Sequence, residues 1–171
     1  MTADASAAAA RYDGSNVFLA EVDPDRFGAT LAEPVDLASL SDVPEALADL
    51  ETARVGAVEP GDRNESMFER MAPGDLVLCY ADGEYLGAGR VAATFDDADW
   101  AASALWDGAE VAGGYALDDF VAVSVPSRAV NALFDYGAAY APGGLIRVAD
   151  SRVGSSLAAI RLAVARYSDA R

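Results

Sequence analysis

The dipeptide Asp82-Gly83 constrains the fold of this chain most, because it lies between two apolar runs that alternate in polarity. Such a pair suits the left-handed positions of a tight hairpin turn. The stretch "GDLVLCYADGEYLGAGRV" at 74–91 therefore predicts one β-hairpin. With a two-residue turn, Tyr80 lies opposite Tyr85, and period-2 alternation places Gly87 and Gly89 on the same face as both tyrosines.

Two strand positions without side chains predict a shallow trough on that face. In this register Leu78 lies opposite Gly87 and Leu76 lies opposite Gly89. Glycines within a strand let another group pack closely or let the sheet bend into a barrel. They also leave room for a flat ligand beside the tyrosines. These interpretations are compatible, since a bend can itself form a pocket.

The remaining patterns alternate between strands and short helices. We expect further strands at 16–23, 53–58, 115–125 and in "GLIRVA", and helices at 41–52, 64–71, 95–106, 126–134 and 155–167. The predicted fold class is α+β, a curved mixed sheet or open β-barrel flanked by short helices. Residues 16–171 are expected to form one domain ending in a C-terminal helix, and residues 1–15 are expected to be a flexible tail.

The charge of the chain is extreme, with a net charge of −16 over 171 residues. The chain has no Lys, His or Gln, so every basic residue is Arg, and the acids are scattered. This composition resembles that of halophilic, haloarchaeal cytoplasmic proteins. No apolar run is long enough to span a membrane. The single Cys79 cannot form an intramolecular disulfide, which favours a cytoplasmic location.

Acidity does not exclude nucleic acid as a partner if the chain works in concentrated salt. At molar salt the Debye length falls to about 3 Å, so long-range repulsion between two anions nearly disappears. The gain from counterion release shrinks as well. Nucleic-acid binding would then depend on stacking and short hydrogen bonds, with a few arginine–phosphate contacts.

Catalysis is poorly supported by the residue types present. Without His, the Ser-His and Cys-His nucleophile pairs are absent, and one Cys cannot supply the common zinc sites. The glycines of 83–89 lack the strand–turn–helix context of a dinucleotide fold. We therefore expect a non-catalytic binding domain with no cofactor, no metal and no catalytic residue.

The segment "RVGAVEPGDRNESMFERMAPGDLVLCYADGEYLGAGRV" at 54–91 resembles the central part of EVE-type domains. These belong to the PUA-like superfamily, together with YTH domains, and the likeness is greatest to modules fused to modification-dependent restriction endonucleases. The resemblance implies a PUA-like fold and a reader of nucleic acid, DNA more than RNA. Such a domain takes a flipped, often modified base into an aromatic pocket. A fused or associated nuclease of a restriction or defence system would do the cutting.

The resemblance also implies which residues hold the base. Trp106 matches the Trp that follows the return strand, so it is expected to be a stacking wall, whereas Trp100 is expected in the core. Tyr80 and Tyr85 are the other aromatic candidates, although a cross-strand tyrosine pair also stabilises a hairpin without a ligand. Trp106 could equally serve packing alone.

Polar candidates follow the same match. Asn64 is expected to cap a helix and can present its amide to a base, and Arg63 beside it contacts phosphate or base unless it pairs with Asp62 or Glu65. Outside the matched segment, Asp23 comes just after the first expected strand, and we expect it to accept from a base amino group or to serve as a turn residue before Pro24.

Near the second strand, where the family often has Trp, this chain has Val55 and Gly56, so these two are expected at the pocket. Arg90 and Arg147 are the candidate phosphate contacts, with a structural role as the alternative for Arg90. Two other functions use the same pocket: a small-molecule sensor for a nucleotide-like ligand, and a protein-interaction module that receives a partner's side chain.

Overall fold

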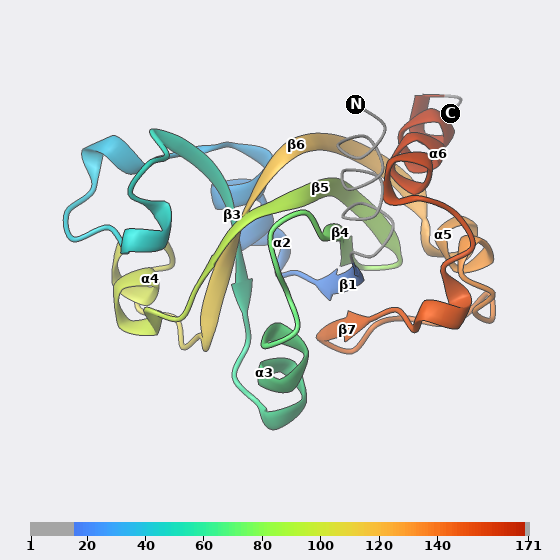
Figure 1. The fold of residues 1–171 in the computed structure, drawn as a ribbon, viewed down its shortest axis with the longest axis horizontal. Coiled ribbons are helices and arrows are strands. Elements are labelled where there is room, and N and C mark those ends of the chain that lie inside the picture. Colours follow the sequence, from blue (N-terminus) through green and yellow to red (C-terminus); the bar gives the residue numbers. More distant parts are fainter. Residues whose placement is uncertain (1–15, 170–171) are drawn as a thin grey trace, which may run out of the picture.

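The computed structural model describes residues 16–169, so the predicted tail at 1–15 lies outside the described residues. Within this range the chain forms one mixed sheet of seven strands in the order β2-β3-β6-β5-β4-β1-β7 (Figure 1). The strands are β1 (Val17–Glu21), β2 (Val35–Asp36), β3 (Thr52–Val58), β4 (Leu76–Ala81), β5 (Glu84–Phe95), β6 (Gly113–Pro126) and β7 (Leu145–Arg147).

Short helices connect these strands. The α-helices are α2 (Pro24–Arg26), α3 (Asp62–Phe68), α4 (Ala98–Leu105), α5 (Ser127–Leu133) and α6 (Leu157–Asp169). A π-helical segment, η1 (Phe27–Ala32), and the 3-10 turns η2 (Leu37–Ser39), η3 (Glu45–Leu47) and η4 (Asp150–Arg152) complete the set. None of the helices at 16–169 is long and apolar enough to cross a membrane.

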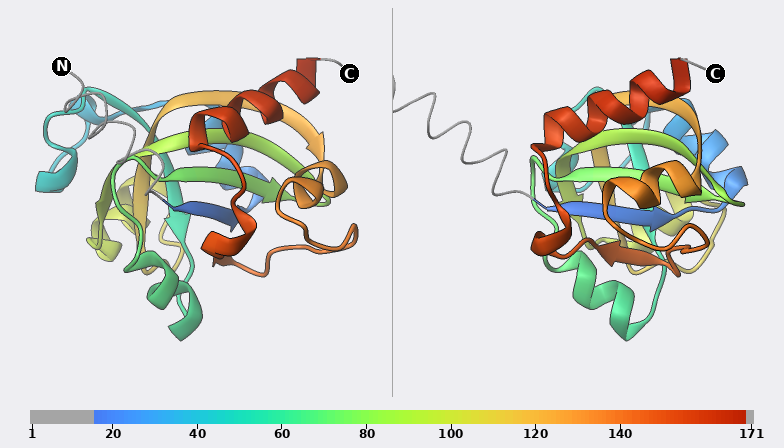
Figure 2. Two further views of the ribbon diagram at one scale, coloured as in Figure 1. Left: turned by 45° about the vertical axis from the view of Figure 1, so that its right-hand side comes forward. Right: turned by 90° about the vertical axis from the view of Figure 1, so that its right-hand side faces the viewer.

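The sheet is strongly curved, because β5 and β6 are long and arch over the shorter strands (Figure 2). β1 pairs in parallel with β4, and the other strand pairs are antiparallel. The curl is not closed by pairing between β3 and β1, since neither strand is the neighbour of the other. The predicted α+β class with a curved mixed sheet is therefore confirmed.

Alternating side chains of the strands supply separate apolar clusters. Phe18, Val77 and Cys79 face a cluster that η1 and α3 help to cover. Their neighbours Val17 and Leu78 face the opposite side, where α5 and α6 pack. A third cluster lies between β3, α4 and the segment of η2 and η3. Burial raises the pKa of the Cys79 thiol to about 12, so this Cys stays a neutral core residue.

The hairpin forms at the predicted turn. Asp82 has a φ of 51° and Gly83 a φ of 85°, so both residues are in the left-handed region. Tyr80 pairs with Tyr85 as predicted, and their rings meet edge to face at a centroid distance of 5.3 Å. Beyond this pair the predicted register is wrong, because Leu86 is an extra residue that forms a bulge.

The bulge moves both glycines to the other face of the sheet. Gly87 lies opposite Cys79 and Gly89 opposite Val77, whereas Leu78 lies opposite Ala88. The tyrosines consequently do not share a face with the glycines, and the predicted trough between them is wrong.

Core side chains occupy the space that the glycines leave. A Cβ added to Gly87 would lie 2.4 Å from Cζ of Phe120, and one added to Gly89 would lie 3.1 Å from Cβ of Leu117. Of the interpretations offered for the two glycines, close packing is therefore the correct one.

Two helix predictions also need correction. The expected helix at 41–52 is only the 3-10 turn η3, which follows Pro44. The helix expected at 64–71 begins at Asp62 with Gly61 as its N-cap, and the carboxylate of Glu65 accepts a hydrogen bond from the Gly61 N–H at 3.1 Å. Asn64 is thus inside α3 and is not its cap.

Gly87→Ala tests the packing at the bulge. The added methyl group would collide with the Phe120 ring, and overpacking of this kind costs about 1–3 kcal/mol. The thermal unfolding midpoint should fall by about 3–10 °C. Phe120→Leu in the same chain should recover part of the loss.

Gly137→Ala is the matched control, because no atom lies within 4 Å of a Cβ at that position. Its unfolding midpoint should equal that of the unaltered chain. Equal midpoints for both alanine variants would contradict the packing described for β5.

Candidate functional site

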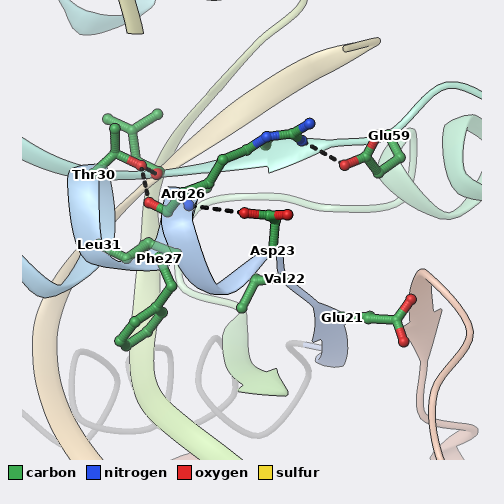
Figure 3. A pocket seen from close by; sticks show the side chains of 11 residues that line it. Glu21, Val22, Asp23, Arg26, Phe27, Thr30, Leu31 and Glu59 are labelled. Carbon is green, nitrogen blue, oxygen red and sulfur yellow. Dashed lines mark hydrogen bonds and ion pairs between the residues drawn. The ribbon is translucent and has the colours of Figure 1, made fainter. Parts of the chain in front are cut away.

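A pocket lies at the open seam of the sheet, between the end of β1 and the edge of β3 (Figure 3). The α2–η1 segment forms its remaining wall. The lining residues are Glu21, Val22, Asp23, Arg26, Phe27, Thr30, Leu31, Val55, Gly56, Ala57 and Glu59. Three of the predicted site residues, Asp23, Val55 and Gly56, therefore meet in one pocket.

Asp23 starts the helical wall of the pocket. Its Oδ1 accepts hydrogen bonds from the backbone N–H groups of Asp25 at 2.9 Å and Arg26 at 3.1 Å, and Pro24 occupies the first helical position. This is a helix N-cap followed by a favoured Pro. Among the described residues no hydrogen bond uses Asp23 Oδ2, and the residue is exposed.

The edge of β3 supplies backbone groups to the pocket. Thr30 Oγ1 donates to the carbonyl oxygen of Val55 at 2.6 Å, so this carbonyl points away from β6 and toward η1. Backbone groups of an antiparallel strand alternate between its two edges, so those of Ala57 point the same way as those of Val55. Strand β2 pairs with β3 only at Thr52 and Ala53, which leaves the pocket stretch uncovered.

The pocket is nearly closed in this structure. The guanidinium of Arg26 forms an ion pair with Glu59 across its mouth (Figure 3). Phe27 also lines the pocket, but its ring points away from this ion pair and packs against Phe120 at a centroid distance of 6.3 Å. The enclosed volume is about 10 Å³, which is room for roughly one water. A planar ligand can therefore enter only if Arg26 and the α2–η1 segment move.

Trp106 supports this wall from behind. It is 6% exposed, and its indole N–H donates to Thr30 Oγ1 at 3.3 Å. Its ring packs between α4 and β3 in the third apolar cluster. Trp106 is consequently not an open stacking wall here, contrary to the expectation, because Thr30 lies between it and the pocket.

The prediction that Trp100 lies in the core is also wrong. Its side chain is only half-buried, packs edge to face on Phe95, and donates from its indole N–H to the Ser41 carbonyl at 2.9 Å. The fully packed indole is that of Trp106.

Tyr80 and Tyr85 lie outside the pocket. Both pack in the cluster on the opposite face, with exposed fractions of 8% and 0%. Burial raises the pKa of Tyr85 far above its usual value, with smaller contributions from Tyr140 and Tyr80. These two rings are core residues in this structure, and the expected role in base stacking does not fit their position.

Position 56 has room only for glycine, because the Tyr115 ring packs against its backbone. A Cβ at this position would lie 2.2 Å from Cζ of Tyr115, so the Tyr115 ring occupies the space that a side chain would need. Burial raises the pKa of the Tyr115 phenol well above its usual value, which keeps it neutral. The bare backbone of Gly56 is therefore a fixed part of the pocket.

Asn64 connects the two sides of the seam next to the pocket. Its Oδ1 accepts a hydrogen bond from the Leu145 N–H at 3.0 Å, and its Nδ2 donates to the Glu59 carbonyl at 3.3 Å. The Asn64 amide is thus occupied by the protein. Arg63 is exposed, and none of the ion pairs within 16–169 includes it, so the expected pairing with Asp62 or Glu65 is absent there.

The predicted phosphate contacts are held in structural roles. Arg90 is 7% exposed and its Nε donates to the Gly74 carbonyl at 2.9 Å. Arg147 donates to Asn16 Oδ1 at 2.7 Å and forms an ion pair with Asp150 at 2.7 Å. Burial of the first and neutralisation of the second oppose phosphate binding.

Sequence reasoning missed Arg26, Phe27 and Thr30, which form the helical wall. The signal was present in "DPDRF" at 23–27, where Asp followed by Pro is a helix start. We expected only a turn at this point.

No protein-family model and no curated protein matches the sequence. The structure is similar to the N-terminal domain of McrB from Thermococcus gammatolerans, solved bound to m5C DNA, with a TM-score of 0.63 and 14% sequence identity. The match covers 81% of this chain and 92% of that domain. The chain has the fold of that domain, so the PUA-like fold expected from residues 54–91 is confirmed.

A double-mutant cycle on Trp106 and Thr30 tests the support behind the pocket. Trp106→Phe removes the N–H donor and Thr30→Val removes the shared hydroxyl, and each loss leaves a buried group unpaired at about 1–3 kcal/mol. The double variant should cost less than the sum of the singles by about 0.5–1.5 kcal/mol, measured by denaturant unfolding.

Trp100→Phe with Thr30→Val is the control cycle, because the Trp100 indole bonds to Ser41 instead. It should be additive. Additivity in both cycles would show that Trp106 does not support Thr30.

Proposed function

We propose that this domain is a DNA reader that takes one flipped base, in its modified form, into the pocket between β1 and β3. The observation that carries the proposal is the position of this pocket, at the open seam of a fold shared with a domain bound to m5C DNA. Three residues expected from the sequence as base contacts line it: Asp23, Val55 and Gly56.

The chemistry of the lining suits the edge of a base. The carboxylate of Asp23 can accept a hydrogen bond from the exocyclic amino group of cytosine or adenine through Oδ2. The backbone N–H and C=O of Ala57 offer a donor and an acceptor to the rest of that edge. At Gly56 the Tyr115 ring fills the space of a side chain, so only the backbone of this residue is offered to the base.

Base stacking and the opening of the pocket determine the free energy of binding. Phe27 is the aromatic side chain in the lining, and base–aromatic stacking contributes about 1–3 kcal/mol per base. Extruding a base from a duplex costs a few kcal/mol, so edge hydrogen bonds are needed as well. The ligand must also separate Arg26 from Glu59, which frees a guanidinium beside the bound nucleotide.

The domain would bind without cutting. In this proposal it is the recognition part of a restriction or defence system in the cytoplasm, and a nuclease in the same or an associated chain cleaves. Arg63, exposed on α3, stays a predicted phosphate contact. The acidic surface requires that binding be measured in concentrated salt.

Asp23→Asn tests the base contact. Asn caps a helix as well as Asp does, so α2 should be retained while the charged acceptor is lost. Tryptophan fluorescence in molar KCl, with oligonucleotides carrying unmodified or methylated cytosine or adenine, should show tightest binding to one methylated form. A hydrogen bond to a charged group contributes about 1.5–3 kcal/mol, so the variant should bind that form at least about tenfold more weakly.

Asp25→Asn makes the same change of charge two residues away and should bind as the unaltered chain does. Flat titrations with every oligonucleotide would remove the proposal. Binding of free nucleoside without any oligonucleotide affinity would favour the sensor of a nucleotide-like molecule instead.

Glu59→Gln tests the closed mouth. The Arg26–Glu59 pair must open before a ligand enters, so its loss should raise the affinity by up to about fivefold. This factor corresponds to the free energy that a partly exposed ion pair contributes. The same titration measures this. Weaker binding would mean that Glu59 itself contacts the ligand.

A further inference from the structure

We propose that Arg152 is a phosphate-binding site for the same DNA, a role that rests on the proposed function. Arg152 ends a stack of three side chains on η4 and on the loop 135–144 that follows α5. We call Arg152, Tyr136 and Tyr140 the tyrosine column. The rings of Tyr136 and Tyr140 are stacked, with centroids 4.1 Å apart and planes inclined by 11°. The Arg152 guanidinium carbon lies 4.4 Å from the centroid of the Tyr136 ring.

Hydrogen bonds fix the guanidinium in place. One terminal nitrogen of Arg152 donates to the carbonyl oxygens of Phe134 at 3.2 Å and Asp135 at 2.7 Å. The loop that carries the tyrosines is itself held by Asn131, which is 0% exposed. Its amide donates to the carbonyls of Ala138 at 3.2 Å and Tyr140 at 2.9 Å. An arginine ordered before binding loses little side-chain entropy when a ligand arrives.

The free side of this arginine faces solvent and carries uncompensated charge. Arg152 is exposed, and among the described residues neither its Nε nor its other terminal nitrogen makes a hydrogen bond. The ion pairs within 16–169 engage Arg26, Arg147 and Arg161 but not Arg152. In a chain with 28 acidic residues, a fixed cation without a carboxylate partner indicates an anionic ligand from outside.

The position of Arg152 relative to the base pocket indicates that this anion is a DNA phosphate. The loop that begins at the Arg152 acceptors ends at Gly144, whose carbonyl accepts a hydrogen bond from the Glu21 N–H at 2.9 Å. Glu21 lines the base pocket. The loop therefore joins the column to the rim of the pocket, and β7 leads on from there (Figure 2). A guanidinium fork presents two parallel N–H donors to the oxygens of one phosphate.

The other exposed arginines lack this combination. Four more exposed arginines form none of the ion pairs within the described part of the chain, but no hydrogen bond between described residues orients any of their side chains: Arg63, Arg70, Arg128 and Arg166. Arg54 is oriented by the carbonyls of Leu31 and Ala32, but it is half-buried and clamps η1. Arg152 is ordered, exposed and unpaired at once.

The salt dependence of binding tests the site. The dissociation constant of the best-bound duplex oligonucleotide is measured at several KCl concentrations for the unaltered chain and for Arg152→Ala. Each phosphate contact contributes about 0.9 to the slope of log K against log [salt] in duplex DNA. The variant should bind several-fold more weakly at the lowest salt, and its slope should be smaller by about that amount. Its preference for the modified base and its binding of free modified nucleoside should be unchanged.

Arg166→Ala is the matched control, because it removes the same charge from an exposed site on α6. Its slope should equal that of the unaltered chain. Arg152→Gln serves if the alanine variant unfolds, since Gln keeps an N–H donor for the loop carbonyls and removes the charge. The unfolding midpoint of each variant is measured alongside.

The outcomes separate the two proposals. Oligonucleotide binding with an unchanged slope in folded Arg152→Ala or Arg152→Gln overturns the phosphate site alone. An equal loss of slope in Arg166→Ala also overturns it, because the effect would then reflect net charge. If the unaltered chain binds no oligonucleotide, the proposed function fails and this site fails with it.

Discussion

The structure depends on how an unclosed sheet satisfies the polar groups along its open seam. Backbone N–H and C=O groups that leave water need partners, and the edge of β3 that faces the pocket has no partner strand among the described residues, since β6 pairs with the other edge. Thr30 supplies a hydroxyl to Val55 near one end of this stretch, and Asn64 joins the chain after β3 to β7 at the other. The pocket is the interval between these two bridges. The proposed binding site is thus the part of the seam that the protein leaves unfilled.

The short segment 23–32 links the stability of the seam to its opening. Asp23 starts the helical wall, Arg26 holds the mouth and Thr30 bonds to the strand behind. Movement of this one segment would loosen all three contacts together. The π-helical geometry of η1 suits such a role, since its hydrogen bonding departs from the regular α-helix and such departures are frequent at functional sites. Regions that open for ligands are generally drawn from the less stable parts of a fold.

Local signals predicted the fold well, and long-range packing accounts for what they missed. The turn at Asp82-Gly83 needs only its own backbone conformation, so it could be predicted from two residues. The bulge at Leu86 is set by rings such as Phe120 from another strand, and no alternation pattern marks it. Helical geometry places the two tryptophans on different sides of α4 but does not say which side is inside. The structure brings Asp23, Val55 and Gly56 into one pocket, whereas the trough expected beside the tyrosines followed from the wrong register beyond the Tyr80–Tyr85 pair.

The contact between Gly56 and Tyr115 has an evolutionary consequence. One volume beside β3 can hold either the phenol ring or a side chain on residue 56, but not both. Homologous chains that gain a side chain at position 56 must therefore carry a smaller residue at position 115, and the two sites should co-vary across β3 and β6. Lineages could then be sorted by which strand fills this volume, even where overall sequence similarity has decayed.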